Sequence, residues 1–560
     1  MGKSERTADE HLESARETVE SIWIAIVLAF VLRAFVLEAF MIPTGSMAPR
    51  LMGKHGQFDC RACGYHYAFG IDQGKDVSLA SPIRFPTTRC PNCEHERGSR
   101  EGAEWGYGGD RVLVLKYLYR FREPQPWDVV VFKNPLNNEE NYIKRLVGLP
   151  GQEIEIVHGD VFARRAQDFN SDGRIDELDF SHPAATDWKI PEKPAKTQEV
   201  MWQIIFDNDY QPDPAVYNGR QWQLLWQPVS GKECWDLQAH GQRVFRFTGS
   251  AKEAELRFSS DREHFYPNYA YNKPKEAIDD SQEDIGYDLK LSFLFVPRDS
   301  NAGVGLHLSS FDDHFLARVG ADGSAELIHG IGDGSNITWD EKKWYSDALL
   351  ARLEVGRGYE VALTHVDRRV ALWLDGKVVF ESTDKLYHAD KESIKALVRE
   401  TLRRRGRLPA PTVAILARGG RSELRHVKLM RDVYYTCPNL VGGGDVPTNH
   451  RGYGTTGNPK VLRKFLKWPD MDEFFVLGDN SPASKDSRMW GFHAPTLRGG
   501  SSDRIYKLGD NYTYQYQDGT VPRYNMMGKA FFVYWPGGFR LQMLKRLPVI
   551  PNVGRMRLIR

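Results

Sequence analysis

Cysteine is scarce in this sequence, with six residues in 560, which excludes the disulfide-dense scaffolds of small secreted proteins. An excess of charge of one sign is also missing, because 75 Lys and Arg residues stand against 74 Asp and Glu residues. Without a positive field to gather phosphates, no nucleic-acid partner is expected. Long hydrophobic runs are nearly absent too, and the single one of membrane grade begins at Ile22.

The chain nevertheless has enough hydrophobic residues to form packed cores. Its residues are 41% hydrophobic and 27% charged, a composition that excludes wholesale disorder. At 560 residues it is too long for one ordinary domain, and three or four units are expected. Short runs of aromatic and β-branched residues separated by turns recur along it, so we predict a mainly β protein.

The apolar run over residues 22–32 holds eleven uncharged residues, whereas a bilayer core requires about 20 residues of helix. A spanning helix would therefore extend over residues 18–38, after a leader at residues 1–17, with Arg33 snorkelling near one end. A cleaved signal peptide is the alternative, but a charged leader precedes the run and no small-residue cleavage site follows it. We predict a single-pass anchor in a lipid bilayer, and the flanking charges do not indicate its orientation.

Four of the six cysteines have the spacing of metal ligands. They form two Cys-X-X-Cys pairs separated by 26 residues, namely Cys60 with Cys63 and Cys90 with Cys93. Four thiolates in this pattern suit tetrahedral zinc, so residues 59–104 are predicted to form a zinc-ribbon-like insertion. Two disulfides or free thiols are the alternative. Cys234 and Cys437 have no such context and are predicted to be buried or free.

Several short blocks carry the residues that could do chemistry. The first places Ser46 in a Gly-flanked turn between two prolines, although a serine in such a turn is usually only a turn residue. Another contains Lys144, and the blocks between resemble short strands punctuated by turns. The blocks cover residues 41–49, 109–114, 127–132, 142–151, 474–491 and 528–536.

In this order behind an apolar N-terminal segment, the blocks resemble type I signal peptidases, the membrane-bound leader peptidases. The resemblance covers residues 20–58, 107–160 and 465–540, less than a third of the chain. It implies that Ser46 is the nucleophile and Lys144 the general base.

The same resemblance implies a set of supporting residues. Thr44 matches the hydroxyl of the oxyanion hole, and Ser484 matches the residue that orients the lysine. Asp479, Asp486 and Arg488 match the polar network beneath the site. The family usually has an Arg and an Asp after the Asn of the fifth block, whereas this chain has Ser481 and Pro482.

The chemistry of a Ser/Lys pair can be argued without the resemblance. A lysine serves as a base for serine when an apolar site lowers its pKa from about 10.4 towards neutrality. Ile143 and Leu146 flank Lys144 closely enough to desolvate it. Taken alone, Lys144 fits a solvent-facing strand lysine better, because Arg145 follows it; the match of the blocks to the family reverses this preference. The chemistry requires no cofactor.

The stretch at residues 161–198 is a linker with a pattern typical of EF-hand-type calcium loops. Oxygen-bearing side chains stand at positions 1, 3, 5, 9 and 12, with Gly173 at position 6. They are Asp168, Asn170, Asp172, Asp176 and Asp179. The pattern is compatible with a calcium site, but a plain polar turn without metal is the favoured alternative, because no convincing helix enters the loop.

Residues 199–432 contain many short strand-like runs and predict an inserted β-sandwich. The clearest run is a hairpin over residues 370–380, whose Asp375-Gly376 turn favours positive φ angles. It resembles concanavalin-like or laminin-G-like jelly rolls, which implies a glycan or protein ligand; a spacer without ligand is the alternative. Residues 390–405 predict a helix that ends in basic residues.

These expectations combine into one hypothesis. The protein is mainly β, with a single transmembrane helix, an antiparallel β catalytic domain split over residues 39–58, 105–160 and 433–540, a jelly-roll-like insertion, and a basic tail at 541–560. By resemblance it removes signal peptides from exported precursor proteins, on the extracytoplasmic side of the cytoplasmic (inner) membrane. An autocleaving repressor is disfavoured by the anchor. A catalytically inactive glycan-binding or scaffold relative is disfavoured by the retention of Ser46 and Lys144.

Overall fold

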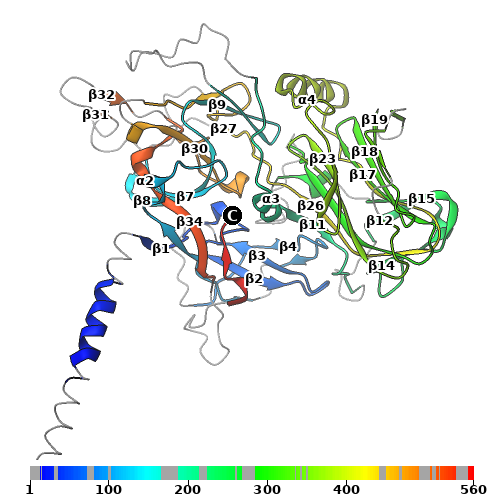
Figure 1. Ribbon diagram of the computed structural model, residues 1–560, viewed down its shortest axis with the longest axis horizontal. Helices are drawn as coiled ribbons and strands as arrows, with labels where there is room; N and C mark the ends of the chain where they lie inside the picture. The colour runs from blue at the N-terminus through cyan, green and yellow to red at the C-terminus, as the bar shows by residue number, and fades with distance from the viewer. Residues whose placement is uncertain are drawn as a thin grey trace, which may run out of the picture.

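The computed structural model confirms a mainly β protein, with few helices among the described residues (Figure 1). It describes residues 13, 16–28, 30, 36–71, 81–98, 102–135, 137–165, 187–213, 224–258, 262–267, 284–333, 336–340, 343–347, 351–440, 450–465, 469–490, 505–507, 513–515, 518–537 and 553–560.

One eight-stranded sheet joins strands from both ends of the chain, in the order β1-β6-β34-β7-β8-β30-β33, with β35 added to β34. β8 therefore lies between β7 and β30, and Arg145 of β8 pairs with Leu477 of β30. The strands are β1 (Leu37–Met41), β6 (Arg111–Leu115), β7 (Val129–Asn134), β8 (Asn137–Gly148), β30 (Glu473–Leu477), β33 (Val521–Pro522), β34 (Met526–Trp535) and β35 (Arg557–Leu558). β35 belongs to the predicted basic tail, of which residues 553–560 are described.

The sequence of β7 shows why this sheet forms. Val129 and Val131 face one hydrophobic cluster, and Val130 and Phe132 face another on the opposite side of the sheet. A strand buried on both faces is a continuous apolar run instead of an alternating one. β7 and β8 therefore lie in the interior of the domain built on this eight-stranded sheet.

A smaller sheet, β10-β9-β29, packs next to this one. Its strands are β9 (Gln152–Val157), β10 (Asp160–Arg165) and β29 (Lys460–Val461). Ile154 and Ile156 of β9 share a hydrophobic cluster with Val147 of β8 and Phe475 of β30. The chain leaves this small sheet for the inserted domain after β10.

The inserted domain consists of two antiparallel eight-stranded sheets around one large core, as predicted for a sandwich (Figure 1). One sheet contains β11 (Gln203–Asp207), β13 (Trp235–Asp236), β14 (Val244–Phe247), β16 (Leu289–Pro297), β22 (Tyr359–Val366), β23 (Arg369–Leu374), β24 (Lys377–Glu381) and β26 (Ser422–Arg431). The other contains β12 (Trp226–Ser230), β15 (Ser250–Phe258), β17 (Ala302–Ser310), β18 (Asp313–Gly320), β19 (Ala325–Gly332), β20 (Ile337–Trp339), β21 (Tyr345–Asp347) and β25 (Val413–Gly419).

The predicted hairpin is confirmed as β23 and β24. Leu374 pairs with Lys377 across the turn, and both turn residues have positive φ, 47° at Asp375 and 73° at Gly376. These angles suit the tight two-residue turn that the Asp-Gly dipeptide favours.

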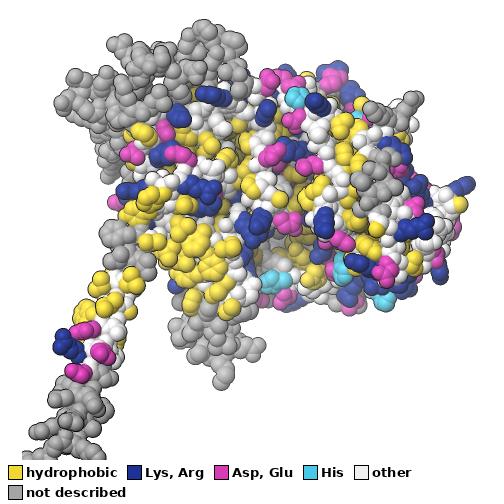
Figure 2. Space-filling model, viewed as in Figure 1, with side chains coloured by type: hydrophobic (Ala, Val, Ile, Leu, Met, Phe, Trp, Pro, Cys, Tyr) yellow, Lys and Arg dark blue, Asp and Glu magenta, His cyan; other side chains and the backbone are white. Residues whose placement is uncertain are grey.

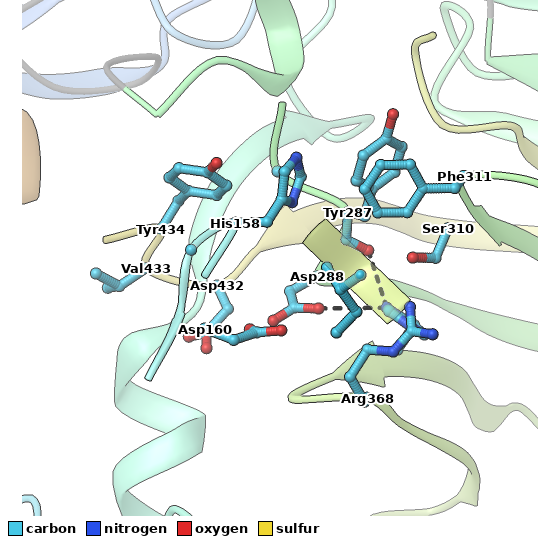
Figure 3. Close-up of a pocket in the computed structure, with 14 residues that line it drawn as sticks. His158, Asp160, Tyr287, Asp288, Ser310, Phe311, Arg368, Asp432, Val433 and Tyr434 are labelled. Carbon is cyan, nitrogen blue, oxygen red and sulfur yellow. Dashed lines mark hydrogen bonds and ion pairs between the residues drawn. The ribbon is translucent and has the colours of Figure 1, made fainter. Parts of the chain in front are cut away.

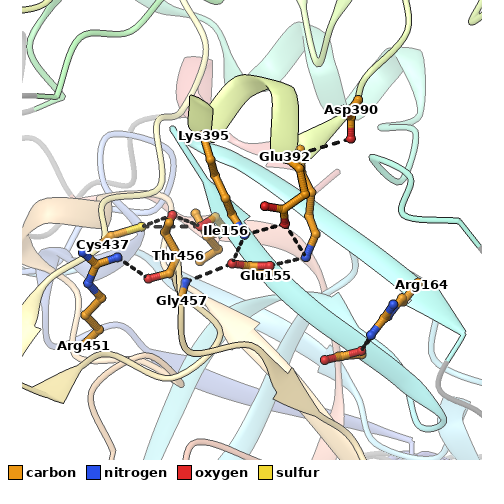
Figure 4. A network of polar contacts seen from close by, with 12 residues as sticks. Glu155, Ile156, Arg164, Asp390, Glu392, Lys395, Cys437, Arg451, Thr456 and Gly457 are labelled. Atoms are coloured by element: carbon orange, nitrogen blue, oxygen red, sulfur yellow. Dashed lines mark hydrogen bonds and ion pairs between the residues drawn. The ribbon is translucent and has the colours of Figure 1, made fainter. Parts of the chain in front are cut away.

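The predicted helix at residues 390–405 is also confirmed, as α4 (Lys391–Arg405). Asp390 caps it by accepting hydrogen bonds from two backbone N–H groups, and Gly406 ends it with a φ of 68°. Lys391 and Lys395 form ion pairs with Glu155 of β9, so the helix ties the sandwich to the small sheet (Figure 4).

Four short strands form the cysteine-bearing segment: β2 (His55–Asp59), β3 (His66–Gly70), β4 (Thr88–Arg89) and β5 (Glu96–Arg97). Asn92 ties this segment to the sandwich, because its side chain donates to Tyr210 O at 2.8 Å and accepts from Asp207 N at 2.6 Å. The remaining helices and paired strands are α2 (Leu118–Phe121), α3 (Ala195–Met201), β27 (Asn439–Leu440), β28 (His450–Arg451), β31 (Ile505–Lys507) and β32 (Thr513–Gln515).

The predicted membrane anchor over residues 18–38 is wrong. No helix in the described part of the chain is long and apolar enough to cross a bilayer. Charged side chains stand at one end of the described helical residues 16–28 (Figure 2), and they include the Arg16–Glu20 ion pair. The chain has entered β1 by Leu37. The predicted single-pass location in the cytoplasmic membrane depended on that anchor, so it is wrong as well.

Candidate active site

Ser46 lies in a single 3₁₀ turn at Gly45–Met47, and only 4% of its surface is exposed. Asn480 holds this turn from the end of β30. Its backbone N–H donates to Ser46 O and its side-chain amide donates to Gly45 O, both at 3.0 Å. The turn that carries Ser46 is therefore fixed by contacts to a segment more than 400 residues away in sequence.

Gly478 makes this close approach sterically feasible. A Cβ atom there would lie 2.5 Å from Ser46 O and 2.2 Å from Ser484 Oγ. Any larger residue would push the turn that carries Ser46 away from β30.

Lys144 lies on β8 opposite Val130 of β7, and 4% of it is exposed. Its Nζ donates a hydrogen bond to Ser46 Oγ at 2.6 Å and a second one to Ile143 O at 3.2 Å. Burial lowers the pKa of Lys144 from 10.5 to about 8, although the charges of Asp486 and Asp479 raise it in part. A neutral amine in contact with a serine hydroxyl can accept the hydroxyl proton.

Asp479 forms a buried ion pair with Arg145, the residue after Lys144. Arg145 Nε and Nη2 each donate to one carboxylate oxygen of Asp479 at 2.7 Å, and both side chains are almost completely buried. Such a two-pronged pair fixes geometry as well as charge. It fastens β8 to the chain that follows β30.

Asp486 and Arg488 form a second buried pair close by. Arg488 donates to the two carboxylate oxygens of Asp486 at 2.8 and 2.7 Å, and Asp486 Oδ2 also accepts from Gly478 N at 3.0 Å. Arg488 further donates to Ser481 Oγ at 2.7 Å. Ser481, one of the two departures from the family pattern, is thus a partner of this network.

Thr44 and Ser484, the two remaining predicted residues, differ in their hydrogen bonds. Thr44 Oγ1 lies 3.4 Å from Ser46 Oγ and donates a hydrogen bond to it. Ser484 is 3% exposed, and its Oγ has no hydrogen-bond partner among the described residues. The orienting role of Ser484 therefore stays a prediction.

Arg145, Asn480 and Asp110 are structural partners of the site that the sequence interpretation did not single out. Asp110 accepts hydrogen bonds from Met52 N at 3.0 Å and Gly537 N at 3.1 Å, which secures the chain after the serine turn. All three lie within the recognised blocks. The sequence did not indicate their roles, because these depend on contacts between one block and another, and a local sequence pattern does not show such contacts.

The four paired cysteines converge in one buried cluster. The Sγ atoms of Cys60 and Cys93 are 3.6 Å apart and those of Cys63 and Cys90 are 3.7 Å apart, and all four lie within 4.8 Å of one another. A tetrahedron with Zn–S bonds of about 2.3 Å has edges of about 3.8 Å, whereas a disulfide requires about 2.05 Å. The thiols therefore fit a tetrahedral metal better than two disulfides.

The remaining predicted positions are two cysteines and the calcium loop. Cys234 is buried and Cys437 is partly buried, and both are free thiols. The predicted calcium ligands Asp168, Asn170, Asp172, Asp176 and Asp179 lie outside the described residues.

Comparison with known proteins links two stretches of the chain to one family. The family described as signal peptidase, peptidase S26, matches residues 106–168 and 463–535. These stretches contain Lys144 and the segment from Asp479 to Arg488, whereas Ser46 lies before them.

Individual relatives match in the same way. "Probable signal peptidase I-2" of Synechocystis is 30% identical over 105 residues, which is 18% of this chain and 43% of that relative. Signal peptidase I of Rickettsia typhi is 25% identical over 145 residues, 26% of this chain and 42% of the relative. The chain spans less than half the length of these curated relatives. It is thus related in part to signal peptidases I.

Solved structures also match, each over part of the chain's length. The carbohydrate-binding module CBM66 of Bacillus subtilis covers 37% of the chain and 94% of its own, at 13% identity and a TM-score of 0.22. A Bacillus licheniformis β-glucanase covers 37% and 92%, at 9% identity and a TM-score of 0.21. At these TM-scores the overlays assign neither a fold nor a ligand to the sandwich.

Proposed function

We propose that this protein is a serine endopeptidase of the signal peptidase I type, with Ser46 as nucleophile and Lys144 as general base. The observation that carries the proposal is the 2.6 Å contact between Lys144 Nζ and Ser46 Oγ in a buried site. The partial match to signal peptidases I supports it, because Lys144 falls within the matched residues.

The reaction proceeds in two halves. Ser46 Oγ attacks the carbonyl carbon of the scissile amide while Lys144 takes the hydroxyl proton and then gives it to the departing amine. The acyl group stays on Ser46 as an ester. Lys144, neutral again, takes a proton from the water that attacks the ester, and gives that proton to Ser46 Oγ as the bond between Ser46 and the acyl group breaks. Thr44 and the backbone N–H of Ser46 supply hydrogen bonds to the oxyanion.

The substrates are exported precursor proteins that carry a signal peptide, cut after a small residue. An inactive scaffold relative is the second candidate, and it is disfavoured because Lys144 Nζ lies 2.6 Å from Ser46 Oγ, within reach for proton transfer.

The test is to incubate the purified full chain with a signal-peptide-bearing precursor and to locate the cut by N-terminal sequencing of the product. A single cut at the end of the signal peptide, absent with Ser46→Ala, is expected. Absence of cleavage by the folded wild-type protein would refute the proposal.

Activity is expected to rise with pH. Lys144 can accept a proton only when neutral, and burial lowers its pKa to about 8. Below that pKa the amine is protonated and inactive, so kcat/KM should climb between about pH 7 and pH 9 and then level off. Precursor cleavage measured across pH 6 to 10 checks this. A midpoint near the ordinary lysine value would show that Lys144 is not the desolvated base.

We also propose that Cys60, Cys63, Cys90 and Cys93 bind one structural zinc ion. Elemental analysis should find about one zinc per chain. The double variant Cys60→Ser, Cys90→Ser should lose it and melt at a lower temperature, because the short strands of this segment have little core of their own. Cys234→Ser, which alters a buried thiol elsewhere, should keep the zinc. Mass-spectrometric detection of disulfides within the two pairs would contradict the assignment.

A further inference from the structure

Residues 553–560, part of the predicted basic tail, are built into the eight-stranded sheet. Strand β35 pairs with β34, with Leu558 opposite Phe532, and the end of the chain, marked C in Figure 1, lies beside β34. Past β35, Ile559 N donates to Phe531 O at 2.8 Å. The tail segment, residues 553–560, is therefore fixed in the sheet by its backbone.

Two side chains of the tail segment reach the chain that carries the nucleophile. Ile559 packs against the hydrophobic cluster that contains Met47, a fully buried residue directly after Ser46. Arg557 donates a hydrogen bond to Arg50 O. The backbone that follows Ser46 therefore has a polar contact with the tail segment and shares an apolar cluster with it.

The tail segment also contacts the strand that carries Lys144. Arg145 follows Lys144 on β8, and its Nη1 donates to Arg560 O at 3.2 Å and to Trp127 O at 2.9 Å. The Nε and Nη2 atoms of Arg145 form the buried pair with Asp479. Arg145 therefore connects the tail segment with the ion pair that fastens β8.

We propose that Arg557 and Ile559 are positioning residues for the catalytic pair, an inference that rests on the proposed peptidase function. Ser46 and Lys144 come from separate segments, so the 2.6 Å contact between them depends on how those segments are held together. The tail segment contacts both of them. Misplacement of reacting groups by about 1 Å can lower a rate about a hundredfold.

Loss of either side-chain contact should lower kcat with little change in KM. Arg557→Met keeps a long side chain but loses the donor to Arg50 O, and Ile559→Ala loses the packing. Each should lower kcat for precursor cleavage by about tenfold or more and leave KM within about twofold of the wild type. Arg557→Lys, which keeps a donor and the charge, should recover most of the wild-type kcat. Cleavage is measured with the full chain, well below the melting temperature of each variant.

Two control variants separate positioning from a general loss of stability. Leu558→Ala shortens a side chain of the same strand that is 57% exposed, and it should keep kcat and the melting temperature. His158→Ala truncates a ring that packs against Tyr287 and Phe311, where the small sheet meets the sandwich (Figure 3). It should lower the melting temperature at least as much as Ile559→Ala, because a packed ring is lost, but keep the wild-type kcat.

A measurement without substrate keeps this inference separate from the proposed function. Hydrogen–deuterium exchange reports on the serine turn through the amides of Ala48 and Leu51, which donate to Gly45 O and Met47 O. Both positioning variants should exchange faster there, because a segment with fewer contacts opens more readily. The two control variants should match the wild type.

Each outcome decides one of the two claims. If the wild-type chain does not cleave but the turn exchanges faster in Arg557→Met and Ile559→Ala, the peptidase function is refuted and the support of the serine turn by the tail segment is confirmed. The positioning role is overturned if both variants fold and keep wild-type kcat and exchange, or if His158→Ala loses as much kcat as they do. If Ile559→Ala does not fold, the comparison of Arg557→Met with Arg557→Lys decides the matter.

Discussion

Replacement of Lys144 by Arg should lower kcat for precursor cleavage by about 10⁴-fold or more, to the level of Ser46→Ala. Arginine keeps the positive charge, but it cannot become a neutral base at any accessible pH. Lys144 Nζ lies 2.6 Å from Ser46 Oγ in the wild type. In the variant a permanently charged guanidinium would take its place, so the hydroxyl of Ser46 would lose its proton acceptor. Both variants should be compared with the wild type in the same cleavage assay, with folding checked by circular dichroism.

Lys460 offers a matched control. Burial lowers its pKa to about 8 as well, and it is 8% exposed, but it lies on β29 near the ring of Tyr453. Lys460→Arg should therefore leave kcat within about twofold of the wild type. A folded Lys144→Arg protein with wild-type cleavage would refute the assignment of the base.

Lys460 also shows what the sequence could not reveal. A lowered lysine pKa depends on burial, which arises from strands far apart in the chain, so neither lysine is distinguishable by its neighbours in sequence. The Arg145 that made Lys144 resemble a solvent-facing residue is itself buried, because Asp479, 334 residues away, neutralises it. Local blocks were sufficient to nominate the site residues, but not to establish which of them pair.

Elements defined by local pattern were predicted best. The β23–β24 hairpin was predicted from its Asp-Gly turn and α4 from one continuous segment, which the structure shows to lie between an Asp cap and a terminal Gly. The anchor failed because hydropathy of a short run does not fix how far a helix extends beyond it. The contacts of Asn92 and of Glu155 with the sandwich were not predictable, since they join residues more than 100 positions apart.

The buried pair of Asp486 and Arg488 should be the most sensitive point of the fold. Asp486→Asn preserves shape but leaves the guanidinium of Arg488, which is 1% exposed, without a counter-ion. Breaking a buried pair in this way costs about 3–5 kcal/mol. Urea unfolding should reveal the loss. Glu400→Gln, which removes one partner of the exposed Glu400–Arg403 pair, should leave the free energy of unfolding unchanged within error.

The same variant should also shift the pH dependence of cleavage. The charge of Asp486 raises the pKa of Lys144, and that of Arg488 lowers it. Asp486→Asn removes the first influence and leaves the second, so the pKa of Lys144 should fall and the rise of kcat/KM should move to lower pH. A purely structural role for Asp486 would reduce the amount of active protein without moving the midpoint. Cleavage measured between pH 5 and 9 on the folded fraction separates the two, and an unchanged midpoint would show that Asp486 does not tune the base.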